Sequence, residues 1–176
     1  MTHYDIIGDI HGHAEELRQL LSKLGYQRSG HGFRHTERQA VFVGDFIDRG
    51  PANAEAVQIA RATVEDGNGY AVMGNHEFNA IAFHTRRPDS SEFFRCRCDK
   101  NQRQHQATLD QLSSLELREA INWFKTLPVE ESQKGTFRIT KGDILLFRIS
   151  TMSPFPFPEA TIAVMNRPSS PSDGLC

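Results

Sequence analysis

The sequence predicts an α/β fold with a parallel β-sheet. Three short apolar runs, at residues 4–7, 40–43 and 70–73, alternate with segments in which apolar residues recur at helical spacing. Strands that alternate with helices at this pace are typical of βαβ units, in which successive strands pair in parallel. Each run is followed by a glycine and then by Asp, Asn or His side chains. Because ligands bind at the carboxyl ends of such strands, we expect the functional site at this edge of the sheet.

The first two helices are predicted from apolar spacing and from end signals. The first has leucines at i, i+3, i+4 and i+7 and ends at Gly25, a residue type that often follows a helix. A polar loop is expected between it and the second strand. The second helix has Pro51 in its first turn and continues to Asp66 and Gly67. The leucines of the first helix are Leu17, Leu20, Leu21 and Leu24.

The later part of the chain is less regular. A third helix is expected to start at residues 78–83, followed by a polar loop at residues 85–104. Apolar spacing predicts another helix at residues 108–127, broken near Ser113 and Ser114. The apolar runs at residues 137–139 and 144–149 suggest a β-hairpin.

Composition divides the chain into three parts. Residues 1–127 are predicted to be the N-terminal part of one α/β domain, and residues 128–152 contain the possible hairpin. Residues 153–176 contain five prolines, several serines and no periodicity of apolar residues. Because such a composition buries little apolar surface, we predict that this Pro/Ser-rich tail is disordered.

Length, charge and cysteine content limit the class of protein. A chain of 176 residues fits one domain, and its net charge of −2 argues against a general nucleic-acid or membrane-surface binder. No apolar run approaches the roughly 18 residues of a spanning helix, and the N-terminus does not read as a signal peptide. Cys96, Cys98 and Cys176 lack the spacing of a disulfide framework or a zinc site. We therefore expect free thiols and a cytoplasmic protein.

Three short motifs carry the chemistry. They are residues 8–12 (Gly-Asp-Ile-His-Gly), 44–50 (Gly-Asp-Phe-Ile-Asp-Arg-Gly) and 74–77 (Gly-Asn-His-Glu). Each motif alone is more often an ordinary turn or a surface ion pair. Their joint occurrence, in this order and at three strand ends, indicates one site built from all three.

The motifs offer ligands for metal ions. Asp9 and His11 are two residues apart at a strand end, so their side chains are able to converge on one cation. Asp45 adds a carboxylate that is able to bridge two ions, and Asn75 adds a carbonyl oxygen. Mixed oxygen and imidazole ligands suit Mn, Fe or Zn better than calcium. Two such ions about 3.5–4 Å apart would activate a water and clamp the oxygens of a phosphoryl group.

The same motifs contain side chains suited to phosphate chemistry. Arg49 offers a planar guanidinium that is able to bind phosphate through two parallel hydrogen bonds. His76 is suited to protonating a leaving oxygen, with Asp48 orienting its ring.

A basic stretch follows the third motif. It either overhangs the site and attracts a polyphosphate or phosphopeptide, or it is a solvated loop, which is the favoured interpretation. Its basic side chains are Arg86, Arg87, Arg95, Arg97, Lys100 and Arg103.

Together the three motifs resemble the signature of the calcineurin-like metallophosphoesterases. The Asp-Arg-Gly at residues 48–50 and Glu77 point to the branch that contains phosphoprotein phosphatases and bacterial symmetrical diadenosine tetraphosphatases. The resemblance spans about residues 4–84 and continues more weakly to residue 127. It implies a four-layer α/β/β/α sandwich that is incomplete at the C-terminus.

The resemblance also implies roles for single side chains. Arg49 and His76 would bind the substrate phosphate, and His76 with Asp48 would act on the leaving group. Two divalent ions are implied, and the first would share one carboxylate with the second. The implied metal ligands are Asp9, His11 and the shared Asp45 for the first ion, and Asn75 for the second.

The sequence departs from the family pattern after residue 127. The family completes its second metal site with two later histidines, the second of them in a Gly-His-x-His-like motif, whereas the last histidine here is His105. A truncated or frameshifted gene product explains this better than an unusual enzyme, and we expect an incomplete second site. His84 and His105 are either replacement ligands or surface or local structural histidines, and the latter interpretation is favoured.

Two functional hypotheses follow. One is a metallophosphatase that hydrolyses a phosphate ester or phosphoanhydride with a metal-activated water at a dinuclear site. Its substrate would be a phosphorylated small molecule, a nucleoside polyphosphate or a phosphoprotein, because the motifs handle only the phosphoryl group. The alternative is a truncated, catalytically impaired fragment that binds metal or a phosphorylated ligand without efficient turnover.

Overall fold

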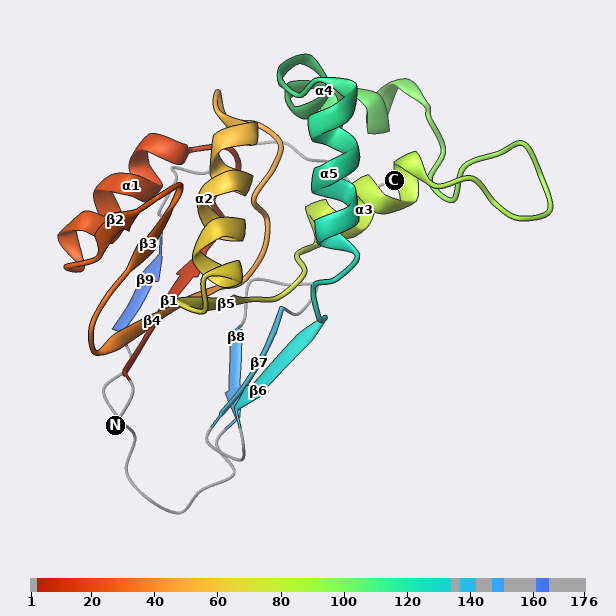
Figure 1. Cartoon of the computed structure of the whole chain (residues 1–176). Helices are drawn as coiled ribbons and strands as arrows, with labels where there is room; N and C mark the ends of the chain where they lie inside the picture. Colours follow the sequence, from red (N-terminus) through yellow and green to blue (C-terminus); the bar gives the residue numbers. More distant parts are fainter. Residues whose placement is uncertain (1–2, 134–136, 142–146, 151–160, 165–176) are drawn as a thin grey trace.

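The computed structural model of the chain describes residues 3–133, 137–141, 147–150 and 161–164 (Figure 1). It confirms the predicted alternation of strands and helices in the N-terminal part. The helices are α1 (Ala14–Lys23), α2 (Asn53–Glu65), α3 (Asn75–His84), α4 (Asp99–Gln111) and α5 (Ser114–Phe124). The strands are β1 (His3–Gly8), β2 (Gln27–Ser29), β3 (Gly32–Arg34), β4 (Arg38–Phe42), β5 (Gly69–Ala71), β6 (Glu130–Gln133), β7 (Phe137–Lys141), β8 (Phe147–Ser150) and β9 (Thr161–Val164).

The central sheet has the strand order β5-β4-β1-β9, and all of its pairs are parallel. Ile7 and Phe42 belong to the main core, whereas their neighbours Ile6 and Val41 belong to a second buried cluster. Since successive side chains point to opposite faces, the sheet is buried on both, as parallel sheets are. Parallel pairing places the carboxyl ends of β1, β4 and β5 at one edge, and each is followed by one of the three motifs.

Helices α1 and α2 lie side by side along the central sheet (Figure 1). Leu17 and Leu21 are fully buried, and Leu20 and Leu24 pack against the same core, so the predicted leucine face of α1 is confirmed. Helix α2 begins at Asn53. The predicted place of Pro51 in its first turn is therefore wrong.

The loop predicted between the first helix and the second strand contains an antiparallel hairpin of β2 and β3. Phe33 is buried, and its backbone N–H donates to Thr63 Oγ1 at 3.0 Å. Gly32 passes so close to α2 that a Cβ there would lie 2.6 Å from the backbone nitrogen of Thr63. These contacts with α2 stabilise a hairpin whose own side chains carry little strand signal.

Helices α3, α4 and α5 follow the third motif. The predicted loop at residues 85–104 extends only to Cys98, because α4 begins at Asp99. The predicted break in the next helix is confirmed, since α4 ends at Gln111 and α5 begins at Ser114. Ser113 caps α5: its hydroxyl accepts from the N–H of Glu116, whose carboxylate accepts from the N–H of Ser113.

Strands β6, β7 and β8 form an antiparallel sheet, which agrees with the predicted pairing of the two later apolar runs. Residues 142–146 of that hairpin lie outside the described residues. Four residues of the predicted disordered tail, Thr161–Val164, form β9 beside β1, so for them the prediction is wrong. The rest of the tail lies outside the described residues. Among the described residues, no helix follows α5 to supply the outer layer of a four-layer sandwich.

Two further expectations concern the surface. No helix in the described ranges is both long and apolar enough to cross a membrane. Cys96 and Cys98 are free thiols and both are exposed, and Cys176 lies outside the described residues.

Two glycines with the same backbone conformation provide a matched test of the close approach between the second and third motifs. Gly44 (φ +79°) and Gly67 (φ +74°) are both left-handed, but only at Gly44 would a Cβ clash, 2.1 Å from the nitrogen of Gly74. We expect Gly67→Ala to lower the free energy of unfolding by about 1–2 kcal/mol, the usual cost of this conformation. Gly44→Ala should cost about 1–3 kcal/mol more, because the chains must also move apart. Urea denaturation measures both, and equal losses would contradict the proposed tight contact.

Candidate active site

The predicted site residues of the first two motifs have an unusual backbone conformation. Asp9, His11, Asp45, Asp48 and Arg49 have φ values of 47°, 44°, 56°, 70° and 70°. No other non-glycine residue in the described ranges has a positive φ. Each left-handed residue costs about 1–2 kcal/mol. Because such strain clusters at functional sites, its concentration in the first two motifs supports a site there.

Backbone hydrogen bonds join the first motif to the second. The N–H of His11 donates to the carbonyl of Asp45 at 2.7 Å, and the N–H of Gly12 donates to that of Phe46 at 2.7 Å. The N–H of Gly50 donates back to the carbonyl of His11 at 2.9 Å. These bonds fix the two loops against each other at the sheet edge.

Glu77 joins the third motif to the second. Its buried carboxylate accepts the backbone N–H groups of Asp45 at 2.7 Å, Phe46 at 2.8 Å and Gly74 at 3.0 Å. Burial, and next the nearby Asp45 carboxylate, raise the pKa of Glu77 to about 7, and the backbone donors oppose this rise. Glu77 therefore has a structural role that holds two motifs together, which was not predicted from the sequence.

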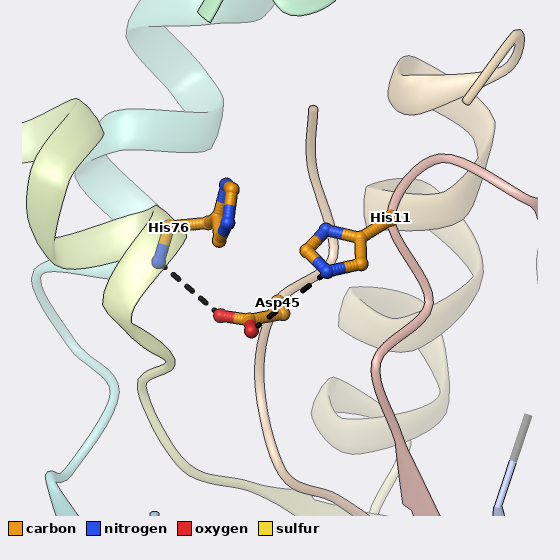
Figure 2. Close-up of side chains that lie close together, drawn as sticks. All are labelled: His11, Asp45 and His76. Atoms are coloured by element: carbon orange, nitrogen blue, oxygen red, sulfur yellow. Dashed lines mark hydrogen bonds and ion pairs between the residues drawn. The ribbon is translucent and has the colours of Figure 1, made fainter. Parts of the chain in front are cut away.

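Three side chains with metal-binding atoms meet where the motifs converge. One ligand atom each of His11, Asp45 and His76 lies within 4.8 Å of the others. Asp45 Oδ2 is 3.9 Å from His11 Nε2, and Asp45 Oδ1 accepts the backbone N–H of His76 at 3.2 Å. Figure 2 shows the two imidazole rings with the Asp45 carboxylate between them. The cluster includes His76, for which the sequence suggested a catalytic role, and does not include Asp9.

The hydrogen bonding of His11 fits metal binding. Its Nδ1 donates to the carbonyl of Ile47 at 3.0 Å. Neutral imidazole with a proton on Nδ1 carries its lone pair on Nε2, the atom that faces Asp45. Histidines that bind metals commonly donate their other ring N–H to a backbone carbonyl. Burial, above all, lowers the pKa of His11, which favours this neutral form.

The side chain of Asn75 also lies against Asp45. Its amide oxygen faces both carboxylate oxygens of Asp45 at 3.2 Å, and the alternative orientation of the amide would place its nitrogen there as a donor. The second orientation satisfies both groups, because the amide nitrogen then donates to both carboxylate oxygens. Asn75 therefore adjoins Asp45, and its amide carries an oxygen of the kind expected of a metal ligand.

Asp48 is the centre of a buried hydrogen-bond network. One of its oxygens, Oδ2, accepts from His76 Nδ1 at 2.6 Å. The other, Oδ1, accepts from His105 Nδ1 at 2.8 Å and from the Thr108 hydroxyl at 2.6 Å. Burial raises the pKa of Asp48, but the three hydrogen bonds outweigh it and hold the pKa well below its usual value. Asp48 is therefore ionised, and its carboxylate accepts from the ring of His76.

His84 and His105 form a pair, with their Nε2 atoms 3.2 Å apart. His105 is buried and directs its other nitrogen to Asp48. This arrangement fits the favoured interpretation, in which both are surface or local structural histidines. Because His105 is buried, only the structural part of that interpretation applies to it. Burial, and next the neighbouring His105 and Arg97, lower the pKa of His84 to about 4.

The lowered pKa of His84 predicts a pH effect on stability. The unfolded state binds a proton at His84 below about pH 6.5, whereas the folded state binds it only near pH 4. Stability is therefore lost as the pH falls from 6.5 to 4. We expect the loss between pH 7 and pH 5, measured by urea denaturation, to be smaller for His84→Gln than for the wild type. An unchanged loss would contradict the assigned environment of His84.

A pocket of about 530 Å³ opens beside the cluster. Asp48, Arg49, Asn75 and His76 line one part of it. Its other lining residues, from α3 and from the segment that ends in α4, are Asn79, Ala80, Phe83, Arg95, Asn101, Arg103, Gln104, His105 and Ala107. Arg49 is exposed, so its guanidinium is accessible to a ligand in this pocket.

Sequence patterns had given no role to Thr108, no structural role to Glu77, and no contact with Asp48 to His105. One signal was present, since His105 and Thr108 are three residues apart and therefore share one face of α4. Both are among the few buried residues of that helix. A polar pair on the buried face of a polar helix indicates a buried hydrogen-bonding partner.

Comparison with known proteins gives the family. A sequence model of the calcineurin-like phosphoesterases matches residues 3–169. The idea that the resemblance ends near residue 127 is therefore wrong. Residues of this chain are 47% identical to a bis(5′-nucleosyl)-tetraphosphatase of Oceanobacillus iheyensis, over 41% of this chain and 29% of the relative. Against the enzyme of the same name from Halalkalibacterium halodurans, the identity is 42%, over 42% of this chain and 30% of the relative.

These relatives are named asymmetrical tetraphosphatases. The matched segment spans less than a third of their length. Among solved structures, a Saccharomyces cerevisiae serine/threonine phosphatase superposes with a TM-score of 0.51 at 17% identity, covering 81% of this chain and 41% of the phosphatase. This likeness confirms the fold. Since the family model matches nearly the whole sequence, the chain belongs to the calcineurin-like phosphoesterase family.

Proposed function

We propose that this chain is a metal-dependent hydrolase of phosphate esters or phosphoanhydrides. One observation carries the proposal: His76 belongs both to the metal-ligand cluster and to a histidine–carboxylate pair. Its backbone N–H donates to Asp45 of the cluster, and its ring donates to Asp48. Arg49 opens onto the adjoining pocket. Cation ligands, a proton donor and a phosphate-binding guanidinium therefore adjoin one space.

The proposed metal ligands are Asp9, His11, Asp45 and Asn75, with Asp45 shared between two ions. Bound divalent ions would lower the pKa of water and neutralise charge on phosphoryl oxygens. We propose Mn, Fe or Zn, because oxygen and imidazole ligands suit these metals. For manganese in particular, the support is this ligand chemistry.

We propose that the remaining side chains transfer a proton and bind phosphate, roles that do not require them to bind a metal. The Asp48 carboxylate stabilises the imidazolium form of His76, whose Nε2 is then able to donate a proton to the leaving oxygen. Arg49 would bind two phosphate oxygens through parallel N–H bonds. Because Asp48 also accepts from His105 and Thr108, its position does not depend on His76 alone.

Nucleoside polyphosphates are the substrate class that we propose first. The support is the name of the relatives at 42–47% identity. Phosphoproteins and other phosphorylated small molecules share the same reacting group and are the next classes to test. A cytoplasmic location remains part of the proposal, because the described cysteines are free thiols.

A second candidate is a chain that binds metal or a phosphorylated ligand with little turnover. The observation that favours it concerns the second ion. Among the described residues, Asp45 and Asn75 are the ligands that we assign to this ion. His84 contacts His105, and His105 donates to Asp48. Losing ligands from a two-metal site would lower turnover strongly.

The test is phosphate release from diadenosine tetraphosphate, ATP and p-nitrophenyl phosphate in excess manganese, together with the metal content of the mass-verified chain. The proposal expects manganese-dependent turnover that Asp9→Ala and His76→Asn both lower. Only Asp9→Ala should lower metal content. Metal binding without turnover would favour the second candidate. Loss of metal in His76→Asn would show that His76 is a ligand.

A further inference from the structure

The part of the pocket lining that lies outside the motifs carries positive charge that the proposed chemistry does not use. Arg95 and Arg103 line it, together with Asn101 and Gln104. Within the described ranges, no Asp or Glu oxygen lies within 4.0 Å of either guanidinium or of Arg49. Guanidinium groups that share a pocket and lack a carboxylate partner attract anions.

The acidic side chain of the pocket cannot neutralise these arginines. Asp48 is the one carboxylate among the described lining residues. It offsets one of the three arginine charges of the lining, and its two oxygens already accept from His76, His105 and Thr108. The lining therefore carries an excess of positive charge, which a phosphate-bearing ligand would compensate.

Arg95 is held in place before any ligand arrives. Its Nη2 donates to Asn101 Oδ1 at 3.0 Å and to Gln104 Oε1 at 2.8 Å, and its backbone N–H donates to the carbonyl of Ala82 at 3.0 Å. The two side-chain partners are neutral amides, which orient the guanidinium without cancelling its charge. Since Arg95 is half-buried and fixed, binding there costs little side-chain entropy.

Other cations of the same basic stretch have different roles. Arg97 stacks on Phe93, with its guanidinium carbon 3.6 Å from the ring centre, and also lies over Phe83 at 5.0 Å. Arg86 lies 5.1 Å from the Phe93 ring centre. These stacks fix the segment that carries Arg95 against α3. The favoured prediction of a solvated loop fits the exposed basic side chains of the stretch, whereas Arg95 is half-buried and lines the pocket.

The size of the pocket also exceeds the need of one phosphate. About 530 Å³ lies within the roughly 300–1,000 Å³ of small-molecule sites. A phosphate group has the bulk of only a few water molecules of about 30 Å³ each. A phosphate held at Arg49 would leave most of the volume, including the space beside Arg95 and Arg103, for the rest of the ligand.

We propose that Arg95 and Arg103 form a second anion subsite that binds the phosphate groups of the substrate beyond the one held at Arg49. The inference rests on the proposed function for the place of the reacting phosphate. The ligand chemistry is a chain of two or more phosphates, which a nucleoside polyphosphate and an inorganic polyphosphate share. Arg95 supplies an oriented guanidinium whose Nε and Nη1 are still able to donate, and the exposed Arg103 supplies a second charge.

The test measures binding, so that it does not depend on turnover. Tripolyphosphate, ATP and inorganic phosphate are titrated against the full chain by ³¹P NMR, without divalent ions, because these ions bind phosphate chains themselves. Arg95→Gln and Arg103→Gln should each weaken tripolyphosphate and ATP about tenfold, as expected for one charge-assisted hydrogen bond. Inorganic phosphate should change less than about twofold. Arg95→Lys should recover only part of the loss.

Lys100→Gln is the matched control. This substitution removes one positive charge from α4, the helix that carries Arg103. Lys100 is exposed and does not line the pocket. The proposal expects Lys100→Gln to change all three affinities by less than about twofold. Equal losses in Lys100→Gln and Arg103→Gln would overturn the subsite in favour of a general charge effect. If the arginine variants lose affinity for ATP but not for tripolyphosphate, the anion subsite is overturned in favour of contacts with the nucleoside.

Failure of the subsite and failure of the proposed function give different results. Selective loss of tripolyphosphate binding in a chain that releases no phosphate from any substrate would support the subsite and reject the proposed hydrolase. Normal turnover, with unchanged tripolyphosphate affinity in both arginine variants, would support the hydrolase and overturn the subsite. Arg103→Gln makes this comparison secure, because its exposed side chain makes no described hydrogen bond that the fold requires.

Discussion

Asp45→Asn is expected to weaken manganese binding by more than about 100-fold and to abolish measurable phosphatase turnover. Loss of a group that only supports a metal ligand costs about 10–100-fold, so loss of a charged ligand itself should cost more. Asp45 lies between His11 and His76 and against Asn75. It therefore adjoins two of the other proposed ligands, His11 and Asn75. Calorimetric titration with manganese and phosphate release from p-nitrophenyl phosphate measure both effects.

Asparagine is the suitable replacement because it keeps the fold. Residue 45 has φ 56°, a conformation that Asn tolerates well, and an amide oxygen is still able to accept the N–H of His76. Asp66→Asn, an exposed change at the end of α2, is the control for loss of one negative charge. Equal manganese affinity in Asp45→Asn and the wild type would rule out Asp45 as a ligand.

The fold could be predicted where apolar side chains set the pattern. The strands β1, β4 and β5 and the helices α1 and α2 bury regular apolar faces, so their periods are visible in the sequence. The β2–β3 hairpin was missed because β2 is polar and depends on contacts of β3 with α2. The start of α4 was missed for a related reason, since the buried residues of this helix are the polar His105 and Thr108.

The site could be predicted only in part. The meeting of the three motifs follows from parallel strand order, because the carboxyl ends of such strands share an edge. The surroundings of Asp48 do not follow, since His105 and Thr108 are 57 and 60 residues away along the chain. No local pattern encodes contacts of this separation. Likewise, nothing in the basic stretch distinguishes Arg95, which faces the pocket, from Arg97, which stacks on aromatic rings.

Asp48→Asn is expected to lower kcat by about 100- to 10,000-fold, the range that positioned proton donors contribute. An amide has one oxygen acceptor, so it is unable to accept from both His76 and His105 as the carboxylate does. The imidazolium form of His76 would lose its counter-charge. Manganese affinity should change little, because Asp48 is not a proposed ligand. Stability should fall by about 1–3 kcal/mol, since a buried donor is left without a partner.

Thr108→Val separates the proposed catalytic effect from the structural one. Valine has the shape of threonine but lacks the hydroxyl that donates to Asp48 at 2.6 Å and accepts its backbone N–H at 3.1 Å. It should therefore lower stability by a similar amount while both imidazoles keep their bonds to Asp48. Urea denaturation, manganese titration and kcat are measured for both variants. If Thr108→Val lowers kcat as much as Asp48→Asn does, Asp48 acts by holding the fold together. A loss of kcat confined to Asp48→Asn, with manganese binding intact, places its effect on the proton held by His76.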